Sequence, residues 1–236
     1  MSEHIVSSYD ADLQDLRRSI SEMGGIAEKM LVDSVNALVR SDTPLAQVVI
    51  SSDTRLDVLQ RDVEEHAILM IARRQPLAVD LRETISAIRV SGDVERIGDL
   101  AKNIAKRALA ISGQYHSQKI VAGVQHMSDL VLEQLKDVLD AYAQQNVAAA
   151  VDVWQRDGAI DSLYTSLFRE LLTYMMEDPR NISFCTHLLF CAKNIERIGD
   201  HTTNIAETIH FLVTGETIAT ERPKNDRSSF TTLTEA

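Results

Sequence analysis

The sequence predicts an all-α protein made of two similar three-helix bundles. Apolar residues recur every three or four positions through long stretches, which is the period of a helix with one buried face. The chain has only 4 prolines and 9 glycines in 236 residues, and 44% of its residues are hydrophobic. This composition favours long helices over a sheet with many turns. The pentapeptide Glu-Arg-Ile-Gly-Asp occurs at 95–99 and again at 196–200, and the separation 196 − 95 = 101 indicates an internal repeat.

The first repeat is predicted over residues 8–113. Its helices are expected at about 11–41, 43–74 and 79–111. Asp42 caps the start of the second helix, because a capping side chain stands just before Pro44 in the first turn. Gln75-Pro76 ends that helix, and Ser112-Gly113-Gln114 separates the two repeats. Gly24-Gly25 in the first helix favours close packing against a neighbouring backbone.

The second repeat follows the same plan over residues 118–214. Its helices are expected at about 121–145, 147–176 and 183–213. Asp157 and Asp161 match Asp53 and Asp57 in the first repeat, since 157 − 53 and 161 − 57 both give 104. The separation between matching residues of the two repeats is therefore 104 in the second helix and 101 in the third. The second repeat is three residues shorter near the turn between these helices. Residues 215–236 are polar and without periodicity, and we expect a flexible tail there.

The charge and the motif content narrow the class of function. A net charge of −11 argues against nucleic acid or an anionic membrane surface, and favours cations or basic protein surfaces as partners. No apolar stretch of 18 residues and no signal peptide is present, so we expect a cytoplasmic protein. Cys185 and Cys191 are expected to be reduced core residues. No nucleophile or phosphate-loop motif occurs, and the single Glu207-x-x-His210 lacks the second copy that a di-iron site needs. An enzyme is therefore not expected.

Acidic residues of each repeat are predicted to meet between its second and third helices. Glu95 and Asp99 lie about opposite the apolar stripe of their helix, so they form an outward ladder that continues to Asn103. Counting residues from the turn at Pro76 puts Asp57 and Asp53 level with them on the antiparallel neighbour. In the second repeat, the counts from Pro179 place Asp161 and Asp157 level with Glu196 and Asp200 to within one residue. The eight predicted ligands are Asp53, Asp57, Glu95, Asp99, Asp157, Asp161, Glu196 and Asp200.

Clustered carboxylates suit hard cations such as iron, manganese, magnesium or calcium. Zinc is disfavoured on these grounds, because no Cys or His cluster accompanies the acids. Two alternatives stay open. The acids form a solvated helix face, or Arg96 and Arg197 neutralise them as surface salt bridges. Asn103, Asn204, Arg96 and Arg197 are the supporting residues of the predicted sites.

Several of these motifs together resemble the PhoU family of phosphate-uptake regulators. The resemblance rests on the doubled Glu-Arg-Ile-Gly-Asp with Asn-Ile downstream, and covers about residues 10–213. Three further segments match: Ala72–Pro76 followed by Asp80-Leu81-Arg82, Leu172–Asp178, and Met23-Gly24-Gly25. It implies two pseudo-symmetric three-helix bundles. It also implies iron or zinc on the paired acidic motifs in some members and no metal in others, and all eight motif positions are acidic in this chain.

The resemblance also implies a function by contact. Family members are peripheral cytoplasmic proteins that couple the phosphate ABC transporter to a sensor histidine kinase, and they restrain uptake and the starvation response when phosphate is plentiful. We therefore expect a non-enzymatic adaptor that reaches the membrane only through its partners. A homodimer is a separate expectation, which no motif specifies. A metal-buffering or di-metal protein and a purely structural scaffold are the alternative hypotheses. No cluster of basic residues indicates direct sensing of phosphate.

Overall fold

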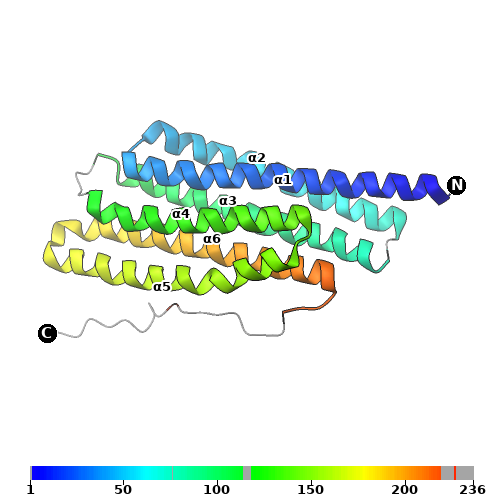
Figure 1. Cartoon of the computed structure of the whole chain (residues 1–236). Coiled ribbons are helices and arrows are strands. Elements are labelled where there is room, and N and C mark those ends of the chain that lie inside the picture. The colour runs from blue at the N-terminus through cyan, green and yellow to red at the C-terminus, as the bar shows by residue number, and fades with distance from the viewer. Residues whose placement is uncertain (1, 76, 114–117, 219–225, 227–236) are drawn as a thin grey trace.

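The computed structural model describes residues 2–75, 77–113, 118–218 and 226. The described chain is helical and without strands, which confirms the all-α expectation (Figure 1). The helices are α1 Ser2–Arg40, α2 Thr43–Arg74, α3 Val79–Ala110, α4 Gln118–Gln144, α5 Val147–Glu177 and α6 Ile182–Thr214, with a short 3₁₀ helix, η1, at Pro179–Asn181. None of these described helices is both long and apolar enough to cross a membrane.

Local sequence signals explain where several helices begin and end. The Asp42 side chain accepts a hydrogen bond from the Leu45 amide at 2.9 Å at the start of α2. Asn146 does the same for Ala149 at 3.2 Å at the start of α5, so both repeats begin their second helix with a side-chain cap. Gly215 ends α6 in the left-handed conformation, with φ of 80°, which glycine adopts at little cost.

The two repeats meet along their third helices, which run antiparallel through the centre of the molecule (Figure 1). Arg89 of α3 lies over the Phe211 ring of α6, and Arg107, further along α3, lies over Phe190, which comes earlier in α6. α3 also packs against α1 and α2, and α6 against α4 and α5. The α2–α3 and α5–α6 turns consequently lie at opposite ends of the molecule. The core is a single apolar cluster to which both repeats contribute.

Three details differ from the expectations. The first helix begins at Ser2 rather than near Ala11, because the polar segment before Leu13 continues the helix although its apolar period is weak. Gly24 packs against the side chain of Leu139 rather than a backbone, and space around Gly25 is open. Pro76, Gln114 and most of the predicted tail lie outside the described residues.

Candidate carboxylate sites

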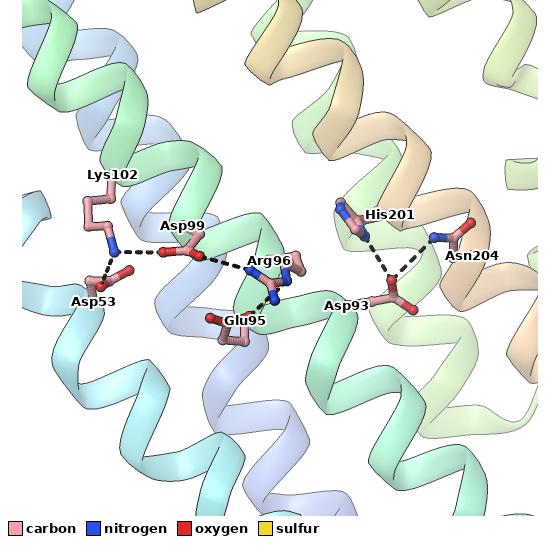
Figure 2. Close-up of polar contacts among 8 residues, drawn as sticks. All are labelled: Asp53, Asp93, Glu95, Arg96, Asp99, Lys102, His201 and Asn204. Carbon is pink, nitrogen blue, oxygen red and sulfur yellow. Dashed lines mark hydrogen bonds and ion pairs between the residues drawn. The ribbon is translucent and has the colours of Figure 1, made fainter.

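The first carboxylate set consists of Asp53 and Asp57 on α2 with Glu95 and Asp99 on α3. Asp53 and Asp99 lie level with each other, as the residue count predicts, because both accept hydrogen bonds from one Lys102 ammonium (Figure 2). The two N–O distances are 2.5 and 2.6 Å. Burial alone would lower the pKa of Lys102, but these carboxylates outweigh it and hold the pKa above its ordinary value.

Arg96 lies against the other side of this set. Its guanidinium is 3.5 Å from Glu95 and 3.3 Å from Asp99, so the salt bridges considered from the sequence are present here (Figure 2). Desolvation raises the pKa of Glu95, and the negative charge of Asp99 adds to the rise, while Arg96 opposes it. The first set is therefore a network in which two cationic side chains already pair with three of its four acids.

The second carboxylate set consists of Asp157 and Asp161 on α5 with Glu196 and Asp200 on α6. The expectation of an outward ladder on the third helix is wrong for Glu196, and the two aspartates on α5 are buried as well. Asp157, Asp161 and Glu196 are only 2%, 4% and 5% exposed, because α5 lies directly over this side of α6. The Thr203 hydroxyl donates a hydrogen bond to Asp157 at 3.0 Å across the two helices.

A second lysine neutralises part of this set. The Lys193 ammonium lies 2.8 Å from Oε1 of Glu196 and 3.2 Å from Asp226. Oε2 of Glu196 is buried and has no hydrogen-bond partner among the described residues. Desolvation accordingly raises the pKa of Glu196; the hydrogen bond from Lys193 opposes this rise, while the charges of Asp200 and Asp161 add to it.

The two lysines do not occupy equivalent positions in the repeat. The counterpart of Lys102 is Thr203, and that of Lys193 is Gly92, since 203 − 102 and 193 − 92 both give 101. The lysine that pairs with the carboxylates therefore stands at a different position on the third helix in each repeat. Both lysines stand three residues from an acid of their set, which is a neighbouring position on a helix. This spacing is the signal in the sequence that indicates the two ion pairs.

The donor types of both sets match the ligands of hard cations. Among the described residues, however, no three His, Cys, Asp or Glu side chains are grouped closely enough to hold a metal ion. In the first set Lys102 lies where a cation bound by Asp53 and Asp99 would be placed. In the second set, Oε2 of Glu196 has no hydrogen-bond partner among the described residues, and this carboxylate oxygen could serve as a ligand to a bound cation. The residues of the second set therefore fit a metal better than those of the first.

The supporting residues have unequal surroundings. Arg197 and Asn103 are exposed. Asn204 does not meet the acids of the second set; it donates a hydrogen bond to Asp93 of the other repeat at 3.3 Å. Asp93 also lies 2.8 Å from Nδ1 of His201, and together these residues link α3 to α6 (Figure 2). This link is not predictable from the periodicity of either helix, because that periodicity does not show which faces of the two third helices meet.

The Glu207-x-x-His210 pair is occupied by structural contacts. Glu207 accepts a hydrogen bond from the indole of Trp154 at 3.0 Å, and Nδ1 of His210 lies 2.9 Å from the Glu216 carbonyl oxygen. Cys185 and Cys191 are buried free thiols, as expected. Burial raises the pKa of Cys191 to about 12, so its thiol is protonated at neutral pH.

Comparison with known proteins covers both repeats. The family model described as the PhoU domain matches residues 20–108 and 124–209. The phosphate-specific transport system accessory protein PhoU homolog of Rhizobium meliloti is 58% identical over 226 residues, spanning 96% of this chain and 95% of that protein. The corresponding protein of Caulobacter vibrioides is 51% identical, spanning 96% and 98%.

Two solved structures of PhoU proteins have the same fold as this chain. The crystal structure of PhoU from Pseudomonas aeruginosa superposes with a TM-score of 0.85 at 40% identity, covering 88% of this chain and 100% of that chain. The phosphate transport system regulatory protein PhoU from Streptococcus pneumoniae gives a TM-score of 0.82 at 28% identity, covering 90% and 100%.

Proposed function

The chain belongs to the PhoU family, and we propose that it is a negative regulator of phosphate uptake and of phosphate-starvation signalling. It acts as a cytoplasmic adaptor between the ATPase of the phosphate ABC transporter and a sensor histidine kinase, and it reaches the inner membrane only through these partners. The observation that carries the proposal is the family match over both repeats, together with near-complete coverage by relatives named for phosphate transport.

The shape of the molecule supports an adaptor. The antiparallel third helices place the turns of the two repeats at opposite ends, so two partners have separate surfaces to contact. In each repeat a lysine pairs with part of the carboxylate set, Lys102 with Asp53 and Asp99, and Lys193 with Glu196. A protein that acts by contact needs no group poised for acid–base chemistry, which agrees with an adaptor rather than an enzyme.

Binding to both partners tests the proposal. Affinity-tagged protein is to be purified from the cell that makes it, with and without chemical cross-linking, and probed for the transporter ATPase and the histidine kinase. We expect both to be recovered, and the ATPase of an unrelated ABC transporter to be absent. Recovery of neither partner would reject the adaptor mechanism.

We also propose that the carboxylates bind metal ions, with iron, manganese, magnesium and zinc as the ions to be tested. The second set is expected to bind first, because Oε2 of Glu196 has no partner while Lys102 fills the first set. The ligands would be Asp157, Asp161, Glu196 and Asp200, with Asp53, Asp57, Glu95 and Asp99 in the first repeat. A bound ion would supply positive charge that holds α5 to α6 and presents a cationic site to a partner.

Elemental analysis separates this proposal from the alternatives. Protein from cells grown with iron and manganese is compared with the variant Asp57→Asn, Glu95→Gln, Asp161→Asn, Glu196→Gln. Stoichiometric metal that the variant loses would establish the carboxylates as ligands. Absence of metal in both would leave the carboxylates as structural groups, and would remove the metal-buffering hypothesis while the adaptor proposal stands.

A homodimer is part of the proposal and has its own test. Light scattering coupled to size-exclusion chromatography should give about twice the 26.3 kDa mass of the chain. A mass of one chain at all concentrations would reject the dimer.

A further inference from the structure

An open cleft of about 510 Å³ lies beside the first carboxylate set, between α2, α3 and α6. Its lining includes Gln60 and Glu64 of α2, and Arg89, Gly92 and Glu95 of α3. Gly92 leaves the floor open, because a Cβ atom built on it would meet nothing within 4 Å. The volume is within the range of small-molecule sites, about 300–1,000 Å³.

The second repeat fills the equivalent place with its own side chains. Lys193 stands where the first repeat has Gly92, since 193 − 92 = 101, and Tyr164 stands where it has Gln60, since 164 − 60 = 104. The Lys193 ammonium lies 5.0 Å from the Tyr164 ring centroid and donates to Glu196 at 2.8 Å.

A third position, next to Tyr164, also differs between the two repeats. Phe168 replaces Glu64, since 168 − 64 = 104, and packs with its ring centroid 6.3 Å from that of Tyr164. The internal repeat thus provides a direct comparison. One repeat carries an ammonium and aromatic rings at this place, and the other has a cleft with an additional acid.

The charges of the cleft indicate which ligand it takes. Three acids line it, Glu64, Asp93 and Glu95, against the two arginines Arg89 and Arg96. Arg96 already pairs with Glu95 and Asp99, and Arg89 lies over the Phe211 ring at 5.4 Å. Asp93 is held by His201 and Asn204. Arg96 contacts only Oε2 of Glu95 in the ion pair at 3.5 Å, so Glu64 and Glu95 are the acids that offer acceptors to a ligand. Glu95 is the counterpart of Glu196, which receives the Lys193 ammonium.

We propose that this cleft binds an organic ammonium group, which takes the place that the Lys193 ammonium holds in the second repeat. Glu95 and Glu64 accept its hydrogen bonds, and Gly92 provides the room. The group belongs to a free polyamine or to a lysine side chain of a partner protein, which share this chemistry. The site goes beyond the proposed regulatory role, and it stands whether or not the transporter and kinase bind.

The test uses the full-length chain, with spermidine and Nα-acetyl-lysine methylamide as probes in titration calorimetry. Both are expected to bind wild type. Gly92→Lys should abolish binding, because it supplies the same internal ammonium as the second repeat. Gly25→Lys is the matched control; it makes the same charge change at another helical glycine with open space around it, and should leave binding unchanged. Glu64→Gln should weaken binding about tenfold, as expected for loss of one charged partner.

The outcomes are distinguishable. Binding of spermidine much tighter than of the lysine analogue assigns the site to a free polyamine, and similar weak binding of both assigns it to a partner's lysine. Thermal unfolding of each variant confirms that it is folded. Absence of binding by either probe, equal loss in Gly25→Lys, or binding of inorganic phosphate that Gly92→Lys abolishes would overturn the proposal.

Discussion

At the scale of single residues, a lysine pairs with part of each carboxylate set, Lys102 with Asp53 and Asp99 and Lys193 with Glu196. Lys102 is mostly buried, with 19% of its side chain exposed, and contacts two acids at once. Such a group differs from a surface ion pair, whose contribution is about 0–1 kcal/mol. Removing the lysine leaves two carboxylates close together and partly desolvated, and this is the costly arrangement.

We therefore expect Lys102→Met to lower the free energy of unfolding by about 1–3 kcal/mol at pH 7. The raised pKa of Lys102 gives the sign of the pH dependence. The stabilisation is fully present below the unfolded lysine pKa of about 10.4, and is lost as the pH rises through the higher folded value. Urea unfolding measures the change. Lys29→Met, which breaks the exposed Lys29–Asp33 pair, should cost less than about 0.5 kcal/mol; equal effects of the two would contradict the internal role of Lys102.

Glu196 should make the protein less stable as the pH rises from acid to neutral. Burial raises its pKa, so the folded state retains the proton over the range from the ordinary value, 4.5, up to the folded value. In that window the folded state binds more protons than the unfolded state, and stability falls with increasing pH.

Glu196→Gln is expected to remove this fall and to unfold at higher urea than wild type at pH 7, with the difference disappearing towards pH 4. Glu133→Gln, at an acid whose side chain is 65% exposed, should follow the wild-type profile. A wild-type profile without the fall would show that Lys193 fully offsets the burial of Glu196.

At the scale of the helices, close packing of α2 on α3 brings the first carboxylate set together. Gly98 lies against Leu56, and a Cβ atom on Gly98 would collide with the Leu56 side chain. Leu56 is fully buried, so it has little room to move. The neighbouring acids on both helices depend on this approach, because it sets the distance that Lys102 bridges.

Gly98→Ala is accordingly expected to destabilise the protein by about 1–3 kcal/mol through overpacking. Gly25→Ala should instead stabilise it by about 0.5–1 kcal/mol, since the site is helical and open and alanine has the higher helix propensity. Thermal or urea unfolding of both variants measures the contrast. Stabilisation by Gly98→Ala would mean that α2 moves away from α3 without cost.

The sequence predicted where the helices lie and which acidic residues stand at the same height on neighbouring helices. Apolar periodicity located the helices, and counting from the turn placed Asp53 level with Asp99, which Lys102 confirms. Burial of Glu196 could not be predicted from its own helix, because it depends on how closely α5 covers α6. The Asp93–His201 link depends likewise on which faces of α3 and α6 meet, and periodicity within one helix does not specify the partner of a polar position. Metal binding and the supporting roles of Asn103 and Arg197 stay predictions.

At the scale of the whole molecule, the two repeats share one core and are not expected to unfold separately. α3 and α6 pack along their lengths, and Asp93 is bonded to His201 and Asn204 across this interface. Trp154 is the only tryptophan and lies buried in the second repeat. Its fluorescence therefore reports on that repeat, whereas circular dichroism reports on all helices.

We expect the two signals to give coincident urea transitions, which is the mark of two-state unfolding. Asp93→Ala should shift both midpoints together to lower urea, since it leaves His201 and Asn204 without their acceptor. A fluorescence transition separate from the circular dichroism transition would contradict a shared core and would make each repeat an independent unit.

The proposed restraint of phosphate uptake is tested by the initial rate of labelled phosphate uptake in phosphate-replete cells. Deleting the gene is expected to raise that rate, and expression of the wild-type chain from a plasmid should return it to the original value. An uptake rate that deletion leaves unchanged, with the transporter present and active, would contradict the regulatory account.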